Sequence, residues 1–123
     1  MTQEGNVFSF QRLLVWQKAV EFAELVFHVI DKIDTPRRHY RLIEQLEAAS
    51  TSISMNIAEG KGRQTTKEFI QYLYIARGSL FETITLLVIF KRTELMAVQM
   101  YNELQKLAEE ITKMINALIK SMK

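Results

Sequence analysis

The residues best suited to bind a ligand form one short segment, Gly60-Lys61-Gly62-Arg63, and Lys67 follows four residues later. Glycines let a backbone turn tightly, and clustered cations attract phosphate groups. Lys61 and Arg63 can therefore hold a single phosphate against the start of a following helix. The segment does not match a P-loop, which needs a longer loop after a strand and Lys followed by Ser or Thr. The pattern favours a positively charged structural turn over a nucleotide site.

Further cations gather at the ends of the expected helices. If neighbouring helices are antiparallel, the cations that open the second helix meet those that close the third. The turn cations lie at the opposite end, near Arg12, Lys120 and Lys123. Such clusters can bind nucleic acid, or they can serve only solubility, and both readings stay open. The candidate nucleic-acid-binding residues are Arg37, Arg38, Arg41, Lys61, Arg63, Lys67, Lys91 and Arg92.

Polar and aromatic residues near the turn have two further interpretations. A polar network can form across the second and third helices, for which we favour a structural role, since an unpaired buried charge costs several kcal/mol. Tyr72 and Tyr74 lie close to Lys67 and can stack on bases, whereas Phe69 fits the core better. The members of the expected network are Asn56, Glu59, Arg63, Arg77 and Glu82.

Catalytic chemistry has little support. Di-iron bundles need Glu-x-x-His pairs on two helices, and the sequence has none; Glu24 and His28 are four residues apart, and His39 follows two arginines. No spacing indicates a Ser, His and carboxylate triad, and there is no cysteine to act as a nucleophile or metal ligand. We expect no metal, no cofactor and no enzymatic activity.

Length and composition describe an ordinary globular protein. The 123 residues, 48% hydrophobic and 24% charged, fit a single domain over 1–123, with residues 1–10 as an N-terminal extension. The absence of cysteine fits a reducing compartment, and the N-terminus has no signal-peptide pattern. The apolar run 83–90 is far shorter than the roughly 20 residues of a bilayer span. We expect a cytoplasmic protein that crosses no membrane.

Apolar residues recur every three or four positions almost throughout, which predicts helices and no strand. The predicted helices run over 11–33, from Thr35-Pro36 to Glu59, over 66–90, and from Leu95 or Ala97 onward. Short connections make neighbours antiparallel, so the fold class is all-α, an antiparallel up-down-up-down four-helix bundle.

Local signals define the turn between the second and third helices. Gly60 can adopt the left-handed conformation that ends many helices, so we expect the second helix to close there. Thr65 can cap the third helix while Glu68 reaches back, as in a capping box. The segment 48–54 is rich in small residues, which favours close helix packing over a hydroxyl-lined site.

The first predicted helix carries two apolar stripes. One contains Leu13, Trp16, Val20, Ala23, Phe27 and Ile30, and the other lies beside it. A helix in a small bundle generally needs one stripe, so the second one favours self-association. The candidate oligomer interface is Ala19, Phe22, Val26 and Val29.

Three motifs together resemble the bacterial 23S rRNA intervening-sequence proteins, also called four helix bundle proteins and described as ribosomal-protein-like. They are Leu14-Val15-Trp16-Gln17-Lys18-Ala19, then Asn56-Ile57-Ala58-Glu59-Gly60 with Gly62-Arg63, and Lys67-Glu68-Phe69 with Ala76-Arg77-Gly78-Ser79-Leu80 and Glu82. The resemblance covers nearly the whole chain. It implies a homopentameric ring, a nucleic-acid role and kinship with the accessory protein of diversity-generating retroelements. The motif residues with an implied structural role are Asn56, Glu59, Gly60, Gly62, Glu68, Arg77, Gly78 and Glu82.

The sequence thus predicts a non-enzymatic, self-assembling bundle that binds RNA or DNA through its basic helix ends. The alternative is a structural or protein-interaction scaffold in which the cations only maintain solubility. A weaker third interpretation, an enzyme with an unseen cofactor, is testable by metal analysis of the purified protein.

Overall fold

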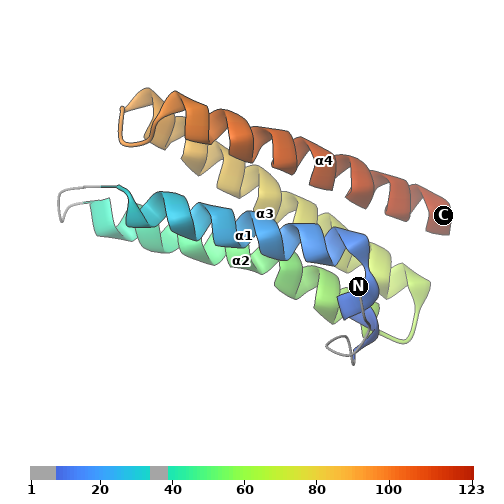
Figure 1. Ribbon diagram of the computed structural model, residues 1–123. Coiled ribbons are helices and arrows are strands. Elements are labelled where there is room, and N and C mark those ends of the chain that lie inside the picture. Colours follow the sequence, from blue (N-terminus) through green and yellow to red (C-terminus); the bar gives the residue numbers. More distant parts are fainter. Residues whose placement is uncertain (1–7, 34–38) are drawn as a thin grey trace.

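Four long helices account for most of the protein. The computed structural model describes residues 8–33 and 39–123, and this part of the chain contains no strand. A short 3-10 helix, η1 (Ser9–Arg12), precedes α1 (Leu14–Asp31), α2 (Tyr40–Lys61), α3 (Thr66–Arg92) and α4 (Val98–Met122). Successive helices run in opposite directions, and α1 and α4 also pack together, which closes the bundle (Figure 1). The predicted all-α four-helix bundle is confirmed.

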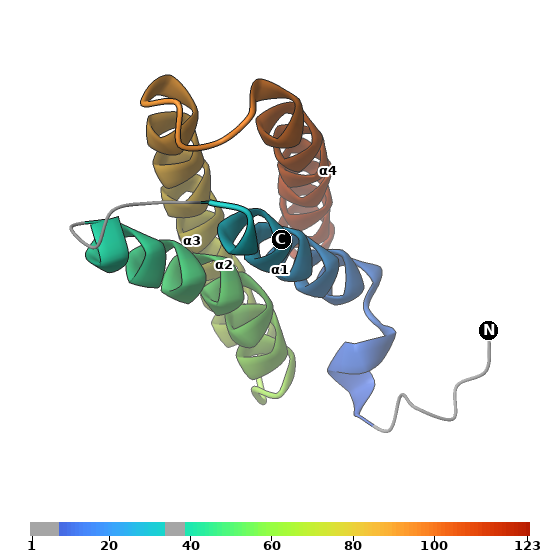
Figure 2. The same ribbon diagram turned by 60° about the vertical axis from the view of Figure 1, so that its left-hand side comes forward.

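The start of α1 differs from the prediction of one helix from Gln11. The extended Leu13 separates η1 from α1, and the Gln17 side chain donates a hydrogen bond to the Gln11 carbonyl (2.8 Å). The Phe10 ring packs edge-on against Trp16, with 5.3 Å between ring centroids. Figure 2 shows η1 outside the bundle, beyond the first turn of α1. The predicted start of the second helix at Thr35-Pro36 lies outside the described residues.

The helix-one stripes have the reverse of their expected roles. Ala19, Phe22, Val26 and Val29, the candidate oligomer interface, are all buried in the protomer's own core. A second copy cannot reach them, so the interface assignment is corrected. The other stripe is less buried, and Phe27 is 42% exposed. Periodicity finds stripes on a helix, but the positions of α2 and α4 decide which stripe faces inward.

The α2–α3 turn also differs in detail from the prediction. Helix α2 does not end at Gly60 but continues through Lys61, and Gly62 follows with a φ of −81°. Gly60 is buried inside the helix, where an added Cβ would lie 2.5 Å from the Cβ of Tyr72. The glycine therefore permits close contact between α2 and α3 and does not reverse the chain.

The Thr65 cap is confirmed in part. Its hydroxyl accepts a hydrogen bond from the Glu68 amide (3.2 Å), as expected for an N-cap. The Glu68 carboxylate, however, accepts from the Thr65 hydroxyl (2.9 Å) and does not bond to the Thr65 amide. The side chain of Glu68 thus orients the cap instead of completing a reciprocal capping box.

The core runs the length of the bundle. Helix α2 contributes small residues to it, including the fully buried Ser50, and α2 and α3 make the most extensive contact between any two elements. The core face of α4 is centred differently from the predicted seam, because Met100, Met114 and Leu118 are only partly buried. The buried positions of α4 are Tyr101, Leu104, Leu107, Ala108, Ile111, Ile115 and Ile119.

Helix α3 is long and apolar enough to cross a bilayer by length and composition, the one such helix in the described part of the chain. The expectation that the protein crosses no membrane is based on the run 83–90, which is only part of the apolar stretch of α3. Core helices of soluble bundles pass the same test, and 39% of the most apolar part of α3 is buried within the protomer. Much apolar surface on this helix is therefore not covered by the protomer itself.

Candidate nucleic-acid interface

The α2–α3 turn presents its cations at one end of the bundle. Lys61 and Lys67 are exposed, and the Lys61 ammonium lies 5.9 Å from the centroid of the Phe69 ring. The start of α1 and the last turn of α4 lie at the same end (Figure 1). A hollow of about 290 Å³ is lined by Lys61, Arg63 and the first residues of α3, together with Leu13 and Leu118. We call this region the turn end.

Arg63 is held in place by two partners. Its guanidinium forms an ion pair with Glu59 (3.0 Å), one turn earlier in the chain. It also donates a hydrogen bond to the Tyr72 hydroxyl and lies 4.9 Å from the centroid of that ring. Arg63 therefore has a fixed position beside the exposed lysines, while part of its charge is compensated by Glu59.

The opposite end contains the remaining candidates. Arg37 and Arg38 lie outside the described residues, whereas Arg41 and Arg92 are exposed. The Lys91 ammonium lies over the Tyr101 ring, 4.2 Å from its centroid. The structure thus divides the candidate residues between two ends of the molecule.

The expected polar network across α2 and α3 does not form as one unit. Asn56 donates to the Ser52 carbonyl (2.8 Å), and the Ser52 and Ser79 hydroxyls lie 2.9 Å apart across the two helices. Glu82 accepts a hydrogen bond from Gln45 (3.5 Å). Asn56 also donates to the Ser52 hydroxyl (2.9 Å), so Asn56, Ser52 and Ser79 form one short network across α2 and α3, whereas the Gln45–Glu82 pair is separate from it.

Arg77 lies on the other side of α3. Its guanidinium donates to Asn116 of α4 (2.8 Å) and covers the Tyr74 ring at 4.9 Å from the centroid. Sequence reasoning missed this link between α3 and α4. The sequence contains one indication of a polar side of α4: Lys113, Asn116 and Lys120 follow one another at steps of three and four residues, which places them on one side of the helix.

Tyr74 connects this side of α3 with the end of the described chain. Lys123 donates a hydrogen bond to the Tyr74 hydroxyl (2.9 Å). This hydrogen bond, with the charges of Lys123 and Arg77, lowers the pKa of the Tyr74 phenol below its usual value. The sequence predicts Lys123 near the turn cations, and the contact with Tyr74 is visible only in the structure.

The described residues show no assembly with the composition of a metal site. Within residues 8–33 and 39–123, no three His, Cys, Asp or Glu side chains are close enough together to hold a metal ion. Thr51 and Ser54, two of the hydroxyl residues of α2, donate to carbonyls of their own helix. The arrangement offers cations and rings at the surface rather than a converging set of reactive groups.

The fold and this surface define a class: small all-α bundles with a cationic turn. The family described as 23S rRNA-intervening sequence protein matches residues 11–117, and the chain belongs to this family. No curated protein matches.

Among solved structures, the chain is similar to a protein of unknown function from the S23 ribosomal protein family of Bacteroides thetaiotaomicron VPI-5482. The two chains are 28% identical, with a TM-score of 0.80. The match covers 87% of this chain and 99% of that one. The similarity therefore extends over the bundle as a whole.

Proposed function

We propose that this protein is a non-enzymatic, cytoplasmic nucleic-acid-binding protein whose turn end contacts the phosphate backbone. The observation that carries the proposal is the convergence of Lys61, Arg63 and Lys67 at the end of the bundle where α4 also ends. Two carboxylates of this end, Glu59 and Glu68, are already engaged by Arg63 and Thr65. The exposed lysines remain available for phosphate, and the family description refers to an insertion in ribosomal RNA.

Self-association is the second part of the proposal. The candidate interface on α1, from Ala19 to Val29, is buried, so self-association is supported instead by apolar side chains on the outside of the bundle. Ile75 and Ile89 of α3 are 51% and 43% exposed, and their spacing of fourteen residues places them on one side of the helix. Copies of the chain that cover this side would form an assembly, for which the resemblance implies a pentamer, and avidity would strengthen each basic end.

The turn-end proposal is tested with the double variant Lys61→Glu/Lys67→Glu. Binding of a structured RNA is measured by filter retention from about 50 to 200 mM salt. We expect the wild-type affinity to fall steeply with salt and the variant to bind far more weakly. If both lysines contact phosphate, the slope of log affinity against log salt should decrease by about 1.5.

Two controls complete this experiment. Lys32→Glu/Lys106→Glu makes the same change in net charge at exposed positions away from the α2–α3 turn. This control should bind RNA with the affinity and the salt dependence of the wild type. Arg41→Glu/Arg92→Glu tests the opposite end separately. A wild-type protein that retains no RNA at 50 mM salt would refute the nucleic-acid proposal and favour the protein-interaction scaffold.

A further inference from the structure

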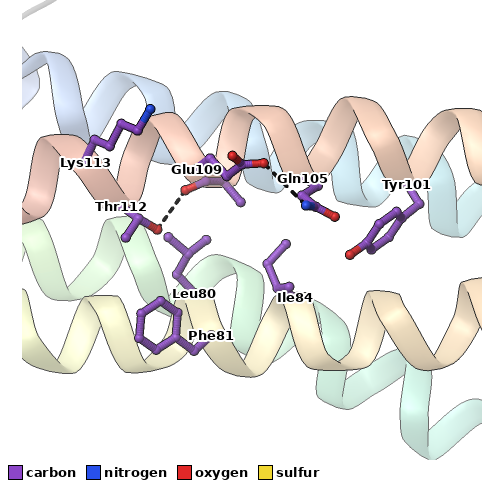
Figure 3. A pocket seen from close by; sticks show the side chains of 9 residues that line it. Leu80, Phe81, Ile84, Tyr101, Gln105, Glu109, Thr112 and Lys113 are labelled. Carbon is purple, nitrogen blue, oxygen red and sulfur yellow. Dashed lines mark hydrogen bonds between the residues drawn. The ribbon is translucent and has the colours of Figure 1, made fainter.

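A groove runs between α3 and α4, away from the cations of the α2–α3 turn. It has a volume of about 380 Å³, with Leu80, Phe81 and Ile84 on the α3 side. Figure 3 shows Gln105 and Thr112 on the side of α4 that faces the groove, whereas the ammonium of Lys113, which also lines it, points away from α3. Phe81 is 52% exposed, although it is a large apolar ring. The groove therefore combines an apolar lining with a flat ring at its edge.

A second exposed ring continues this side of α3. Tyr74 precedes Phe81 by seven residues, which is two helical turns, and is 38% exposed. Arg77 lies between the two rings in sequence, and its guanidinium is 4.9 Å from the Tyr74 centroid and 5.9 Å from that of Phe81. The hydrogen bond from Arg77 to Asn116 fixes the guanidinium over the rings. The result is a preorganised platform of two rings and one cation.

The charge along the platform is predominantly positive. After Glu110, α4 and the residue that follows it contain Lys113, Lys120 and Lys123 and no acidic side chain. Lys123 lies directly on the platform through its bond to Tyr74. Glu109 places a carboxylate at the groove, and this carboxylate accepts a hydrogen bond from the side-chain amide of Gln105 (3.4 Å). An occupant that carries negative charge and flat apolar groups would complement this surface.

We propose that the α3–α4 groove binds an unpaired stretch of nucleic acid, with bases stacking on the Tyr74–Arg77–Phe81 platform and phosphates meeting the lysines of α4. The inference rests on the proposed function and specifies its ligand as single-stranded. Stacking on aromatic and guanidinium planes requires bases outside a duplex, where their faces are free. Lys120 and Lys123 bring the groove toward the turn end, so one strand can contact both regions.

The platform favours this occupant over a protein segment. An apolar helix in a groove needs an apolar rim, whereas here the Arg77 guanidinium lies against both rings and Lys113 stands at the edge. Both rings still keep exposed surface on which bases can stack. A nucleic-acid strand supplies planar bases and a negative charge at each nucleotide. Ribose and deoxyribose strands share this chemistry, so matched RNA and DNA oligonucleotides distinguish the two sources.

The central experiment removes the aromatic ring of Phe81 and keeps an apolar side chain in its place. Affinities of Phe81→Leu, Tyr74→Leu and the double variant are measured by fluorescence anisotropy with a labelled, unstructured twelve-nucleotide RNA, the matched DNA, and a duplex. We expect each single variant to bind the single strands about 5-fold or more weakly, since stacking is worth roughly 1–3 kcal/mol per base. Duplex affinity should not change, and Phe81→Trp should restore or strengthen binding.

Met55→Leu is the matched control, because Met55 is an exposed apolar residue of α2 outside the groove. It should bind as the wild type does, and circular dichroism should show unchanged helix content in every variant. Photocrosslinking of a 4-thiouridine RNA, mapped by mass spectrometry, should label peptides that contain Tyr74 or Phe81.

The outcomes separate this inference from the proposed function. If Lys61→Glu/Lys67→Glu abolishes binding while the ring variants bind like the wild type, the turn-end proposal stands and the groove proposal fails. Ring variants that reduce the assembled mass in light scattering and leave RNA affinity intact would assign the groove to a second copy of the chain, which also overturns the inference. A wild-type protein that binds no nucleic acid would refute both proposals.

Discussion

Gly60 and Gly78 both lie inside helices, but the space around them differs. A Cβ on Gly60 would lie 2.5 Å from the Tyr72 Cβ and 3.0 Å from the Phe69 ring, whereas a Cβ on Gly78 would meet nothing within 4 Å. Neither atom next to Gly60 is the free end of a flexible side chain. Gly60 is thus required by helix packing, while no contact inside the protomer requires Gly78.

Alanine at these two positions should therefore have opposite effects. Gly60→Ala should lower the free energy of unfolding by roughly 1 kcal/mol or more, because overpacking exceeds the gain in helix propensity. Gly78→Ala should raise it by about 1 kcal/mol. Urea unfolding followed by circular dichroism measures both. Equal stabilisation by the two substitutions would show that α2 and α3 are not in close contact at Gly60.

Glu94 adopts the left-handed conformation after α3, with a φ of 63°. The Leu95 amide bonds to the Phe90 carbonyl (2.9 Å) and the Glu94 amide to the Lys91 carbonyl (3.1 Å), the two bonds of a Schellman motif. Glycine usually occupies this position because a Cβ is unfavourable there.

Glu94→Gly should accordingly stabilise the protein by about 1 kcal/mol. The control Glu103→Gly makes the same change at an exposed position inside α4 and should destabilise it by about 1 kcal/mol. Thermal melts of the two variants provide the comparison. A loss of stability in Glu94→Gly would contradict the left-handed assignment.

At the scale of elements, the small residues of α2 determine how closely its neighbours approach. Ser50 is fully buried, and its hydroxyl donates to the Glu47 carbonyl of its own helix (3.1 Å). Ala49 is also buried, while Ala48 faces solvent. The interpretation of this segment as close packing is confirmed at Ser50 and Ala49.

Enlarging Ser50 should consequently disturb the bundle. Ser50→Leu should cost about 1–3 kcal/mol, because the core has no room for the added carbons. Ala48→Leu, two residues earlier on the exposed side, should change stability by no more than about 0.5 kcal/mol. Chemical unfolding distinguishes them. A Ser50→Leu variant as stable as the wild type would mean that the α2 packing is looser than described.

In the whole molecule, α3 takes part in both proposed interactions, the binding of nucleic acid in the α3–α4 groove and the association of copies of the chain. Its inner side forms part of the core, the side toward α4 carries Tyr74, Arg77 and Phe81, and a further side carries exposed Ile75 and Ile89. A 27-residue helix with apolar groups on several sides is consistent with contacts beyond its own bundle.

Light scattering tests the proposed assembly. The wild type should show a mass that is a multiple of the 14.4 kDa chain. Ile75→Lys/Ile89→Lys should reduce the mass to one chain without loss of helix content, because charges on the contact surface disfavour its burial. Val98→Lys, an exposed apolar position at the start of α4, should leave the mass unchanged. A wild type that remains a single chain at high concentration would refute self-association.

Much of the fold was predictable because helices depend on local signals. The spacing of apolar residues, the Thr65 cap and the cations after Phe90 are all read within a few positions of the chain, and the structure reproduces the four helices they predict. The grouping of Lys61, Arg63 and Lys67 at one turn follows from the same local reading.

The helices, their antiparallel order and the cationic turn were predictable from local sequence, since each depends on neighbours along the chain. Three other features required the folded structure: Phe22 faces inward, Gly60 lets α2 and α3 approach closely, and Arg77 bonds to Asn116 across two helices. These features depend on the rotation and distance of helices that are remote in sequence. Periodicity identifies a helix and its apolar stripes, whereas the packing of its neighbours decides which stripe becomes core and which remains surface.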